Sequence, residues 1–283
     1  MKILAIESSA LVASAAIVED ELLKAEFTVN NKLTHSETLL PMIESMTKIS
    51  GLSLSEIDAI AVSAGPGSFT GLRIGAATAK GLALALNIPV IRVSTLQSMA
   101  WSLSLLSDDV VCPVMDARRG QVYCAAYRQG AVLLEEAASD IHTFIGALNA
   151  LDPEGDRGYL FLGDGVPVHS GTITAELSGD VSFAGAACNR QRAADTAVLG
   201  AVLYTKWLQK NSLTSEEVRE KGADALSCFD DIVMNSDDFA PEYLRKSQAE
   251  RELEDGTLED PGKHSLKKMQ SNGPARSKEG NAG

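Results

Sequence analysis

The sequence has few of the residues that metal sites, disulfides or stacking surfaces require. It contains four cysteines without a C-x-x-C pair, four histidines far apart along the chain, and only 5% aromatic residues. Cys112 and Cys124 lie inside apolar runs and lack an activating neighbour, which is typical of reduced, buried thiols. The histidines form no helical pair that would bind a metal from one face. We therefore expect no disulfide framework, no metal site and a core of aliphatic side chains.

Positive charge and long apolar runs are also scarce. Lys and Arg number 25 against 38 Asp and Glu, and the formal net charge is −13. Because an autonomous nucleic-acid binder needs a basic face, this balance argues against direct binding of RNA or DNA. No apolar run approaches the roughly 18 residues of a membrane span, and we expect no signal peptide. The expected compartment is the cytoplasm.

The order of apolar segments indicates an internal repeat. Short apolar runs at 3–6, 12–18 and 22–29 predict three adjacent strands. Alternating helices and strands are then predicted at 36–50, 59–62, 71–86, 90–93 and 96–106. The order restarts with predicted strands at 110–115, 122–127 and 131–134, a helix at 140–151, strands at 159–162 and 181–184, and a helix at 192–208. This order predicts an α/β fold of two similar mixed-sheet domains flanking a cleft, spanning 1–107 and 108–246.

The last segment has a different composition. Residues 247–283 contain no aromatic residue, isoleucine or valine, and they are rich in charged residues, glycine and serine. Such a segment buries too little apolar area to offset its ordering entropy. We predict a disordered tail that is dispensable for folding.

The glycine-rich run at 65–71 follows a predicted strand and opens a predicted helix. Glycine permits positive φ angles and close backbone approach, and the amides of a helix N-terminus can hold an anion. The run lacks the G-K-[ST] ending of a Walker motif. The alternative is a tight turn whose glycines allow close packing on a sheet or a partner.

Polar residues also follow the first strand of each half, at equivalent points of the repeat. Glu7, Ser8 and Ser9 follow the first, and Asp116, Arg118 and Arg119 follow the second. In kinases and ATPases of this architecture, such turns hold nucleotide phosphates across the cleft. Arginine can bind an anion there or form a surface ion pair. The predicted contacts for a weakly bound nucleotide or anion are Glu7, Ser8, Ser9, Gly65, Gly67, Ser68, Asp116, Arg118 and Arg119.

Two helices carry the predicted partner surface. Small residues recur every four positions on the helix at 71–86 and form a flat face that permits close approach. Apolar side chains on the helix at 36–50 cover a wide arc, and its methionines can adapt to a partner. The alternative for both helices is ordinary core packing. The residues assigned to the partner surface are Leu39, Met42, Ile43, Met46, Leu72, Gly75, Ala76, Ala79, Lys80 and Ala83.

The start of the first of these helices is ambiguous in the sequence. Thr34 and Glu37 have the spacing of a capping box, which places the helix start just after Thr34. Pro41 conflicts with an uninterrupted helix that begins so early. The helix therefore either starts near Pro41 or is kinked there.

Several motifs together resemble the TsaB (YeaZ) family. They are MKILAIESS at 1–9, THSE at 34–37 followed by Leu40-Pro41, and GPGSFTGLRIG at 65–75. DARRGQVY at 116–123 and PEYLR at 241–245 extend the resemblance over about residues 1–246. The long run at 65–75 is the most specific of these motifs.

The resemblance implies an actin-like fold of the ASKHA, ribonuclease H-like type, and a non-catalytic role. It implies partnership with the catalytic paralogue TsaD and the ATPase TsaE, which transfer a threonylcarbamoyl group to adenosine 37 of tRNAs reading ANN codons. tRNA would be held only through the complex, and the two helices would pair with TsaD or with a second copy of the chain. Asp195 is similar to an acidic metal ligand of TsaD, but without the TsaD histidines we interpret it as a surface or cap residue.

Two enzyme functions remain as alternatives. One is a small-molecule kinase or ATPase that uses Glu7 or Asp116 near the phosphates, and the other is a metal-dependent, glycoprotease-like peptidase. The sequence contains no G-x-S-x-G elbow and no paired metal ligands. We therefore predict no catalytic residues, no cofactor and no enzymatic activity of the isolated chain.

Overall fold

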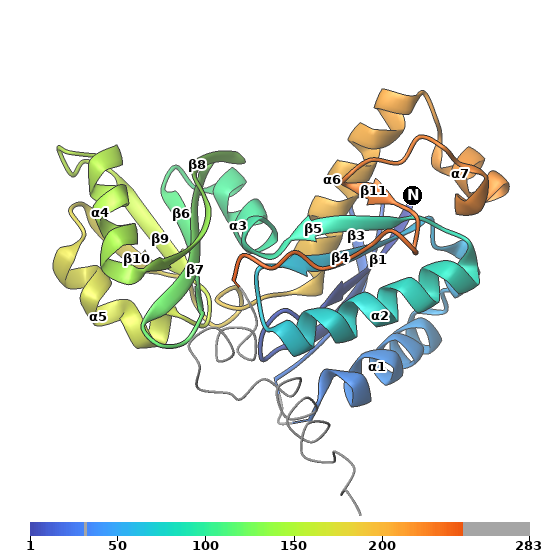
Figure 1. Ribbon diagram of the computed structural model, residues 1–283, viewed down its shortest axis with the longest axis horizontal. Coiled ribbons are helices and arrows are strands. Elements are labelled where there is room, and N and C mark those ends of the chain that lie inside the picture. Colours follow the sequence, from blue (N-terminus) through green and yellow to red (C-terminus); the bar gives the residue numbers. More distant parts are fainter. Residues whose placement is uncertain (31–32, 246–283) are drawn as a thin grey trace, which may run out of the picture. The chain divides into compact units, whose positions relative to one another are not determined.

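The first three predicted strands form one edge of a six-stranded mixed sheet (Figure 1). The computed structural model describes residues 1–30 and 33–245, so the predicted tail at 247–283 lies outside the described residues. The strands of this sheet are β1 at Lys2–Glu7, β2 at Ala13–Glu19, β3 at Leu22–Val29, β4 at Ala59–Gly65, β5 at Val90–Ser94 and β11 at Val233–Met234, in the order β11-β5-β4-β1-β2-β3. β1 pairs with β2 and β2 with β3 in antiparallel fashion, whereas β1, β4 and β5 run parallel.

Helices cover both faces of this sheet. Leu4 and Ile6 of β1 pack under α1 (His35–Ser50) and α2 (Phe69–Leu86). Ile3 and Ala5 point to the opposite face, because successive side chains of a strand alternate, and pack under α6 (Ala193–Asn211). The central strands are therefore apolar throughout, as expected for strands covered on both sides.

The helix α1 begins where the capping box predicts. Glu37 Oε2 accepts a hydrogen bond from the Thr34 backbone N–H at 3.1 Å, and the helix starts at His35. Pro41 lies inside the helix, which continues to Ser50. Of the two alternatives at Pro41, the late start is therefore wrong.

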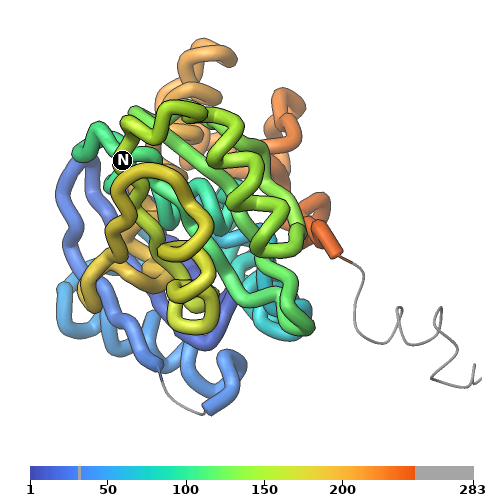
Figure 2. The backbone as a smooth tube through the Cα atoms, turned by 90° about the vertical axis from the view of Figure 1, so that its left-hand side faces the viewer, coloured from blue at the N-terminus to red at the C-terminus, as the bar shows by residue number. Residues whose placement is uncertain are grey.

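A second, five-stranded sheet begins with β6 at Val110. Its order is β10-β9-β6-β7-β8, with β6 at Val110–Asp116, β7 at Gln121–Arg128, β8 at Ala131–Asp140, β9 at Gly158–Leu162 and β10 at Asp180–Phe183. α4 (Ile141–Leu151) and α5 (Val166–Glu176) cover one face, and α3 (Thr95–Leu106) packs on the other. Figure 2 views the chain from the side of these elements, which are coloured green to yellow. The repeated order of three antiparallel strands, a helix and a parallel strand gives two similar α/β halves, and this confirms the predicted fold class.

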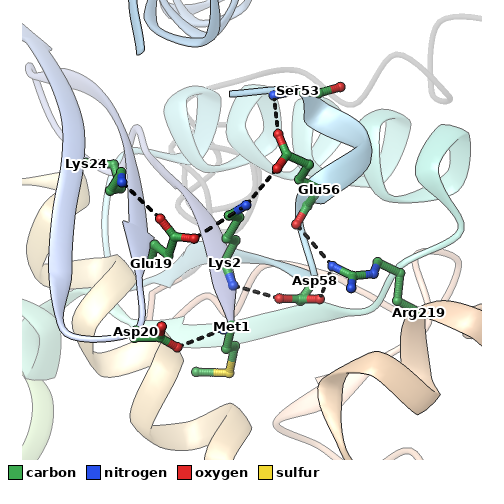
Figure 3. Close-up of polar contacts among 9 residues, drawn as sticks. All are labelled: Met1, Lys2, Glu19, Asp20, Lys24, Ser53, Glu56, Asp58 and Arg219. Atoms are coloured by element: carbon green, nitrogen blue, oxygen red, sulfur yellow. Dashed lines mark hydrogen bonds and ion pairs between the residues drawn. The ribbon is translucent and has the colours of Figure 1, made fainter. Parts of the chain in front are cut away.

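The last fifth of the described chain, from Ala193 onward, does not stay with the second sheet. α6 packs on the first sheet, and β11 pairs antiparallel with β5. α7 (Ser215–Lys221) also packs beside the first sheet. The Arg219 guanidinium is 2.9 Å from Oδ1 of Asp58, and Oδ2 of Asp58 accepts a hydrogen bond from the Lys2 backbone N–H of β1 at 2.6 Å (Figure 3). The assignment of 108–246 to a single domain is therefore corrected, since residues 193–234 complete the first sheet. Residues 1–244 form one unit by their contacts.

Candidate functional site

The turn after β1 is closed by its own hydrogen bonds. Glu7 is fully buried, and its Oε1 accepts bonds from the Ser9 backbone N–H at 2.6 Å and the Ser9 hydroxyl at 2.5 Å. The Ser63 hydroxyl of β4 donates to the other carboxylate oxygen. Burial raises the pKa of Glu7, and the bonds from Ser63 and Ser9 oppose this rise. The carboxylate therefore joins the ends of β1 and β4, and it is not open to a ligand.

The glycine-rich loop packs directly on this turn. The Ser68 backbone N–H donates to the Ser9 carbonyl oxygen at 2.6 Å, and the Ser8 hydroxyl donates to the Gly71 carbonyl oxygen at 2.9 Å. A Cβ at Gly67 would lie 2.3 Å from the Ser9 carbonyl oxygen, and one at Gly71 would lie 2.1 Å from the Ser8 carbonyl oxygen. The glycines thus permit contact between two backbone segments, as the tight-turn interpretation requires.

The predicted anion contacts of the first half are corrected accordingly. Ser8 and Ser9 are buried in contacts with the loop, and Gly65 packs against the carbonyl oxygen of Glu242. Ser68 caps α2, since its side chain accepts the Gly71 N–H at 3.4 Å. Because protein atoms pack against Ser8 and Ser9, the basis for a phosphate site at the turn after β1 is removed, although Ser68 is itself exposed.

The equivalent turn of the second half is exposed. Arg118, Arg119 and Gly120 all have left-handed backbone conformations, with φ of 64°, 56° and 74°. The Arg118 N–H donates to Asp116 Oδ1 at 2.7 Å, and the Asp116 N–H donates to Asp164 Oδ1 at 3.2 Å. Asp116, Arg118 and Arg119 thus lie on one solvent-facing turn, where anion binding stays a prediction.

Sequence reasoning missed the polar contacts at the start of α6. Glu26 of β3 accepts the Ala194 N–H at 3.2 Å and pairs with the Arg192 guanidinium at 2.5 Å, while Ser14 accepts the Ala193 N–H at 3.0 Å. A carboxylate at a helix N-terminus is favourable, because the amides and the helix dipole attract an anion. Glu26 therefore occupies the place that an anionic ligand would take. It lies 166 residues before Arg192, a separation at which no local sequence pattern could indicate the contact.

Asp195 lies in the first turn of α6 and bonds to α3 through the Ser102 hydroxyl, which donates to it at 3.2 Å. Of the two interpretations of Asp195, a surface or a cap residue, the fully exposed surface residue is wrong, because Asp195 is partly buried at the N-terminal end of α6. Burial raises the pKa of Asp195 to about 6, although the charge of Arg192 and the bond from Ser102 oppose the rise. A histidine pair is not near it in the described residues, where no group of three or more His, Cys, Asp or Glu side chains could hold a metal ion.

The raised pKa of Asp195 predicts a pH-dependent difference in stability. The folded protein binds the proton more tightly than the unfolded chain, whose carboxyl has a value near 3.8. The contribution of Asp195 is therefore complete at low pH and is lost as the pH rises through about 6. Relative to Asp195→Asn, the wild-type free energy of unfolding should fall by up to about 3 kcal/mol between about pH 4 and pH 6.

Urea denaturation of both proteins across this pH range measures the difference. Asp238→Asn, at an exposed position, is the matched control and should give a constant difference from the wild type. Parallel pH profiles for the wild type and Asp195→Asn would contradict the prediction.

The structure places the predicted partner residues of α1 and α2 on the inner faces of both helices. Leu39, Met46 and Ala79 are at most 1% exposed and belong to the core under the first sheet. Gly75 faces Ser8, and the Lys80 ammonium donates to the carbonyl oxygens of Asp237 and Phe239 at 3.1 and 3.2 Å. The residues whose assignment as an exposed partner surface is corrected are Leu39, Met42, Ile43, Met46, Leu72, Gly75, Ala76, Ala79, Lys80 and Ala83.

The outer faces of the same two helices carry a different set of residues. α1 exposes apolar side chains at Leu40 and Ile49, which are 53% and 77% exposed. α2 exposes Leu84 together with a second row of small residues, Ala77, Gly81 and Ala85. A Cβ at Gly81 would meet no atom within 4 Å. The two helices lie side by side (Figure 1), and both carry exposed apolar or small residues on faces other than the predicted one.

Five strands of the first sheet follow the same spatial order as the five strands of the second, and each sheet has a turn after its first strand in the sequence. The helices α3 and α6 contact each other. This arrangement defines a protein of the actin-like class. Within the described part of the chain, no helix has the length and apolar content needed to cross a bilayer. Residues 28–253 match the TsaD family, described as tRNA N6-adenosine threonylcarbamoyltransferase.

Individual relatives give a narrower assignment. The chain is 34% identical over 201 residues to the tRNA threonylcarbamoyladenosine biosynthesis protein TsaB of Bacillus subtilis, covering 71% of this chain and 87% of that protein. It is 41% identical over 132 residues to TsaB of Escherichia coli, covering 46% of this chain and 56% of that protein. The solved structure of YeaZ from Pseudomonas aeruginosa matches with a TM-score of 0.56 at 25% identity, covering 72% of this chain and 92% of that one. The chain belongs to the TsaB family, and its match to TsaD reflects the paralogy of the two proteins.

Proposed function

We propose that this chain is a non-catalytic subunit required for threonylcarbamoyl transfer to adenosine 37 of tRNAs that read ANN codons. It acts in a complex with a TsaD-like catalytic subunit and a TsaE-like ATPase. The observation that carries the proposal is the similarity to B. subtilis TsaB, a tRNA threonylcarbamoyladenosine biosynthesis protein, over 87% of that protein. The net charge of −13 supports a role in which other subunits hold the tRNA.

The geometry of the first half supports a non-catalytic role. In an actin-like kinase or ATPase, the turn after β1 must leave amides and side chains free for phosphates. Here Glu7 accepts hydrogen bonds from Ser9 and from Ser63 of β4, and the Ser68 N–H of the glycine-rich loop donates to the Ser9 carbonyl oxygen. The weak nucleotide binding that we propose is therefore confined to the exposed turn at Asp116, Arg118 and Arg119.

We place the partner surface on the outer faces of α1 and α2. Exposed Leu40 and Leu84 supply apolar area, and the small residues Ala77 and Gly81 allow a partner helix to approach the backbone closely. A TsaD-like subunit and a second copy of this chain would compete for this surface. The homodimer and the heterodimer would therefore exclude each other.

The test is complementation of a bacterial strain depleted of its own TsaB. Mass spectrometry of digested tRNA should show that the modified adenosine returns when this chain is expressed, and affinity purification should recover the TsaD-like subunit with it. The purified chain alone should hydrolyse neither ATP nor peptides. ATP turnover that survives contaminant controls and disappears in Asp116→Ala would instead establish the kinase or ATPase alternative.

A further inference from the structure

A small cavity lies at the carboxyl ends of the parallel strands β4 and β5. Its volume is about 260 Å³, and its polar lining consists of Arg92, Ser94, Gln97, Glu136 and Glu242. Apolar walls complete it, among them Pro66 and Ile232. The carboxyl edge of parallel strands is where open α/β sheets commonly bind ligands. The turn at Glu7 does not reach this cavity, so the proposed function leaves it unexplained.

The cation that lines the cavity lacks a hydrogen-bonded partner. Within the described residues, the Arg92 side chain makes no hydrogen bond, and its Nε is buried and unpaired. Oε2 of Glu242 lies 3.7 Å from the Arg92 Nη1, so the two groups form an ion pair without a hydrogen bond, and the guanidinium lies 5.9 Å from the centroid of the Phe239 ring. A buried donor without an acceptor costs free energy, so such a group commonly marks a place that a ligand completes.

The Glu136 carboxylate lines the same cavity and accepts hydrogen bonds at only one of its two oxygens within the described residues. Glu136 of β8 accepts a hydrogen bond from the Tyr127 hydroxyl at 2.9 Å and another from the Ser94 hydroxyl, both at Oε1. Its Oε2 accepts no hydrogen bond from the described residues, and Glu242 adds a second carboxylate to the lining. Burial raises the pKa of Glu136, and a bound cation would lower it again. The cavity thus presents a guanidinium whose Nε has no acceptor, ion-paired at 3.7 Å with Glu242, and a Glu136 carboxylate with one oxygen that accepts no hydrogen bond from the described residues.

We propose that this cavity binds a free neutral L-amino acid with a short side chain. The ligand carboxylate pairs with the Arg92 guanidinium, and its ammonium group pairs with Glu136 and Glu242. This arrangement uses the strong, charge-assisted bonds that arginine forms with carboxylates. The volume is below the about 300 Å³ at which drug-sized pockets begin, so it selects a ligand of amino-acid size over a nucleotide.

The position of the cavity gives the ligand a structural effect. Arg92 belongs to the first sheet, Glu136 to the second, and Glu242 to the segment that bonds to the end of β4 through its N–H and the Ala64 carbonyl oxygen at 2.7 Å. A zwitterion held by all three ties these parts together. Binding should therefore raise the thermal unfolding midpoint, and the stabilisation should grow with the logarithm of the ligand concentration once this exceeds Kd.

The experiment is thermal unfolding and isothermal titration calorimetry of the full chain with glycine, L-alanine, L-serine, L-threonine and L-valine. At least one should bind and raise the midpoint, whereas ethylamine and L-lactate, which each lack one charged group of alanine, should bind at least about tenfold more weakly. Arg92→Gln and Glu136→Gln should each weaken binding by at least about tenfold. Glu242→Gln replaces Arg92→Gln if that variant fails to fold.

The matched control is Glu135→Gln, because Glu135 is the exposed neighbour of Glu136 on β8 and does not line the cavity. It should bind the amino acid as the wild type does. The proposal is overturned if none of the five amino acids binds, if ethylamine or lactate binds as well as alanine, or if the folded cavity variants keep wild-type affinity. None of these results affects the proposed role in tRNA modification, which the complementation test measures separately.

Discussion

Replacing Ala79 with arginine is expected to unfold the protein. Ala79 is fully buried between α2 and the first sheet, in a cluster with Leu39, Met46 and Ile60. A guanidinium at this position would have neither space nor an acidic partner among these apolar groups. An unpaired buried charge costs about 3–5 kcal/mol, and the displaced side chains add to this cost. The loss is comparable with the whole stability of a typical domain, about 5–15 kcal/mol.

The comparison variant is Ala77→Arg, two residues away on the exposed side of the same helix. Arginine has nearly the helix propensity of alanine, so this variant should unfold within about 0.5 kcal/mol of the wild type. Urea denaturation followed by circular dichroism measures both. Equal stability of the two variants would mean that α2 does not lie on the sheet as the structure shows.

The strands and helices of the first half could be predicted from sequence because their signals are local. The run at 65–75 contains both the end of β4 and the start of α2, and Thr34 and Glu37 mark the start of α1 within four residues. The repeat of three strands likewise predicted the start of the second sheet near Val110. Signals of this kind depend on period and capping, which a single segment contains.

Features that depend on distant parts of the chain could not be predicted in the same way. α6 packs on the first sheet because its apolar face covers Ile3 and Ala5 of β1. The apolar pattern of α6 alone is compatible with packing on either sheet. α5 was missed because its apolar residues are not gathered on one face, and only His169 and Ile173 are buried. The bond between Glu26 and Arg192 joins residues that no local pattern relates.

The partner surface was assigned to the wrong helix faces for a related reason. Small residues every four positions allow close packing, but the pattern is the same whether the neighbour is a sheet, a turn or another protein. α2 carries two such rows. Gly71 and Gly75 of the first row pack on Ser8, and Ala77 and Gly81 of the second row face outward. Only the position of the sheet distinguishes the inner row from the outer one.

Arginine substitutions in the outer row are expected to abolish pairing with the TsaD-like subunit while leaving the fold intact. At Ala77 or Gly81 the new side chain would fill the space needed for a close helix contact and would place a charge in the interface. We expect affinity to fall by at least about 100-fold, which corresponds to about 2.7 kcal/mol. The modified adenosine in tRNA of the complemented strain should fall in parallel.

Calorimetric titration of each variant with the TsaD-like subunit measures the affinity, and thermal unfolding checks the fold. Gln209→Arg is the matched control, because it adds the same charge at an exposed position of α6, on the opposite face of the first sheet. It should bind as the wild type does.

Gly81→Ala separates the effect of shape from the effect of charge. Because Gly81 has open space around it and a helical backbone, this variant should be at least as stable as the wild type. It should lose less affinity than Gly81→Arg. Wild-type affinity of the folded Ala77→Arg and Gly81→Arg variants would place the partner on another surface, and loss of binding in Gln209→Arg as well would show that added charge, not the position on α2, weakens the complex.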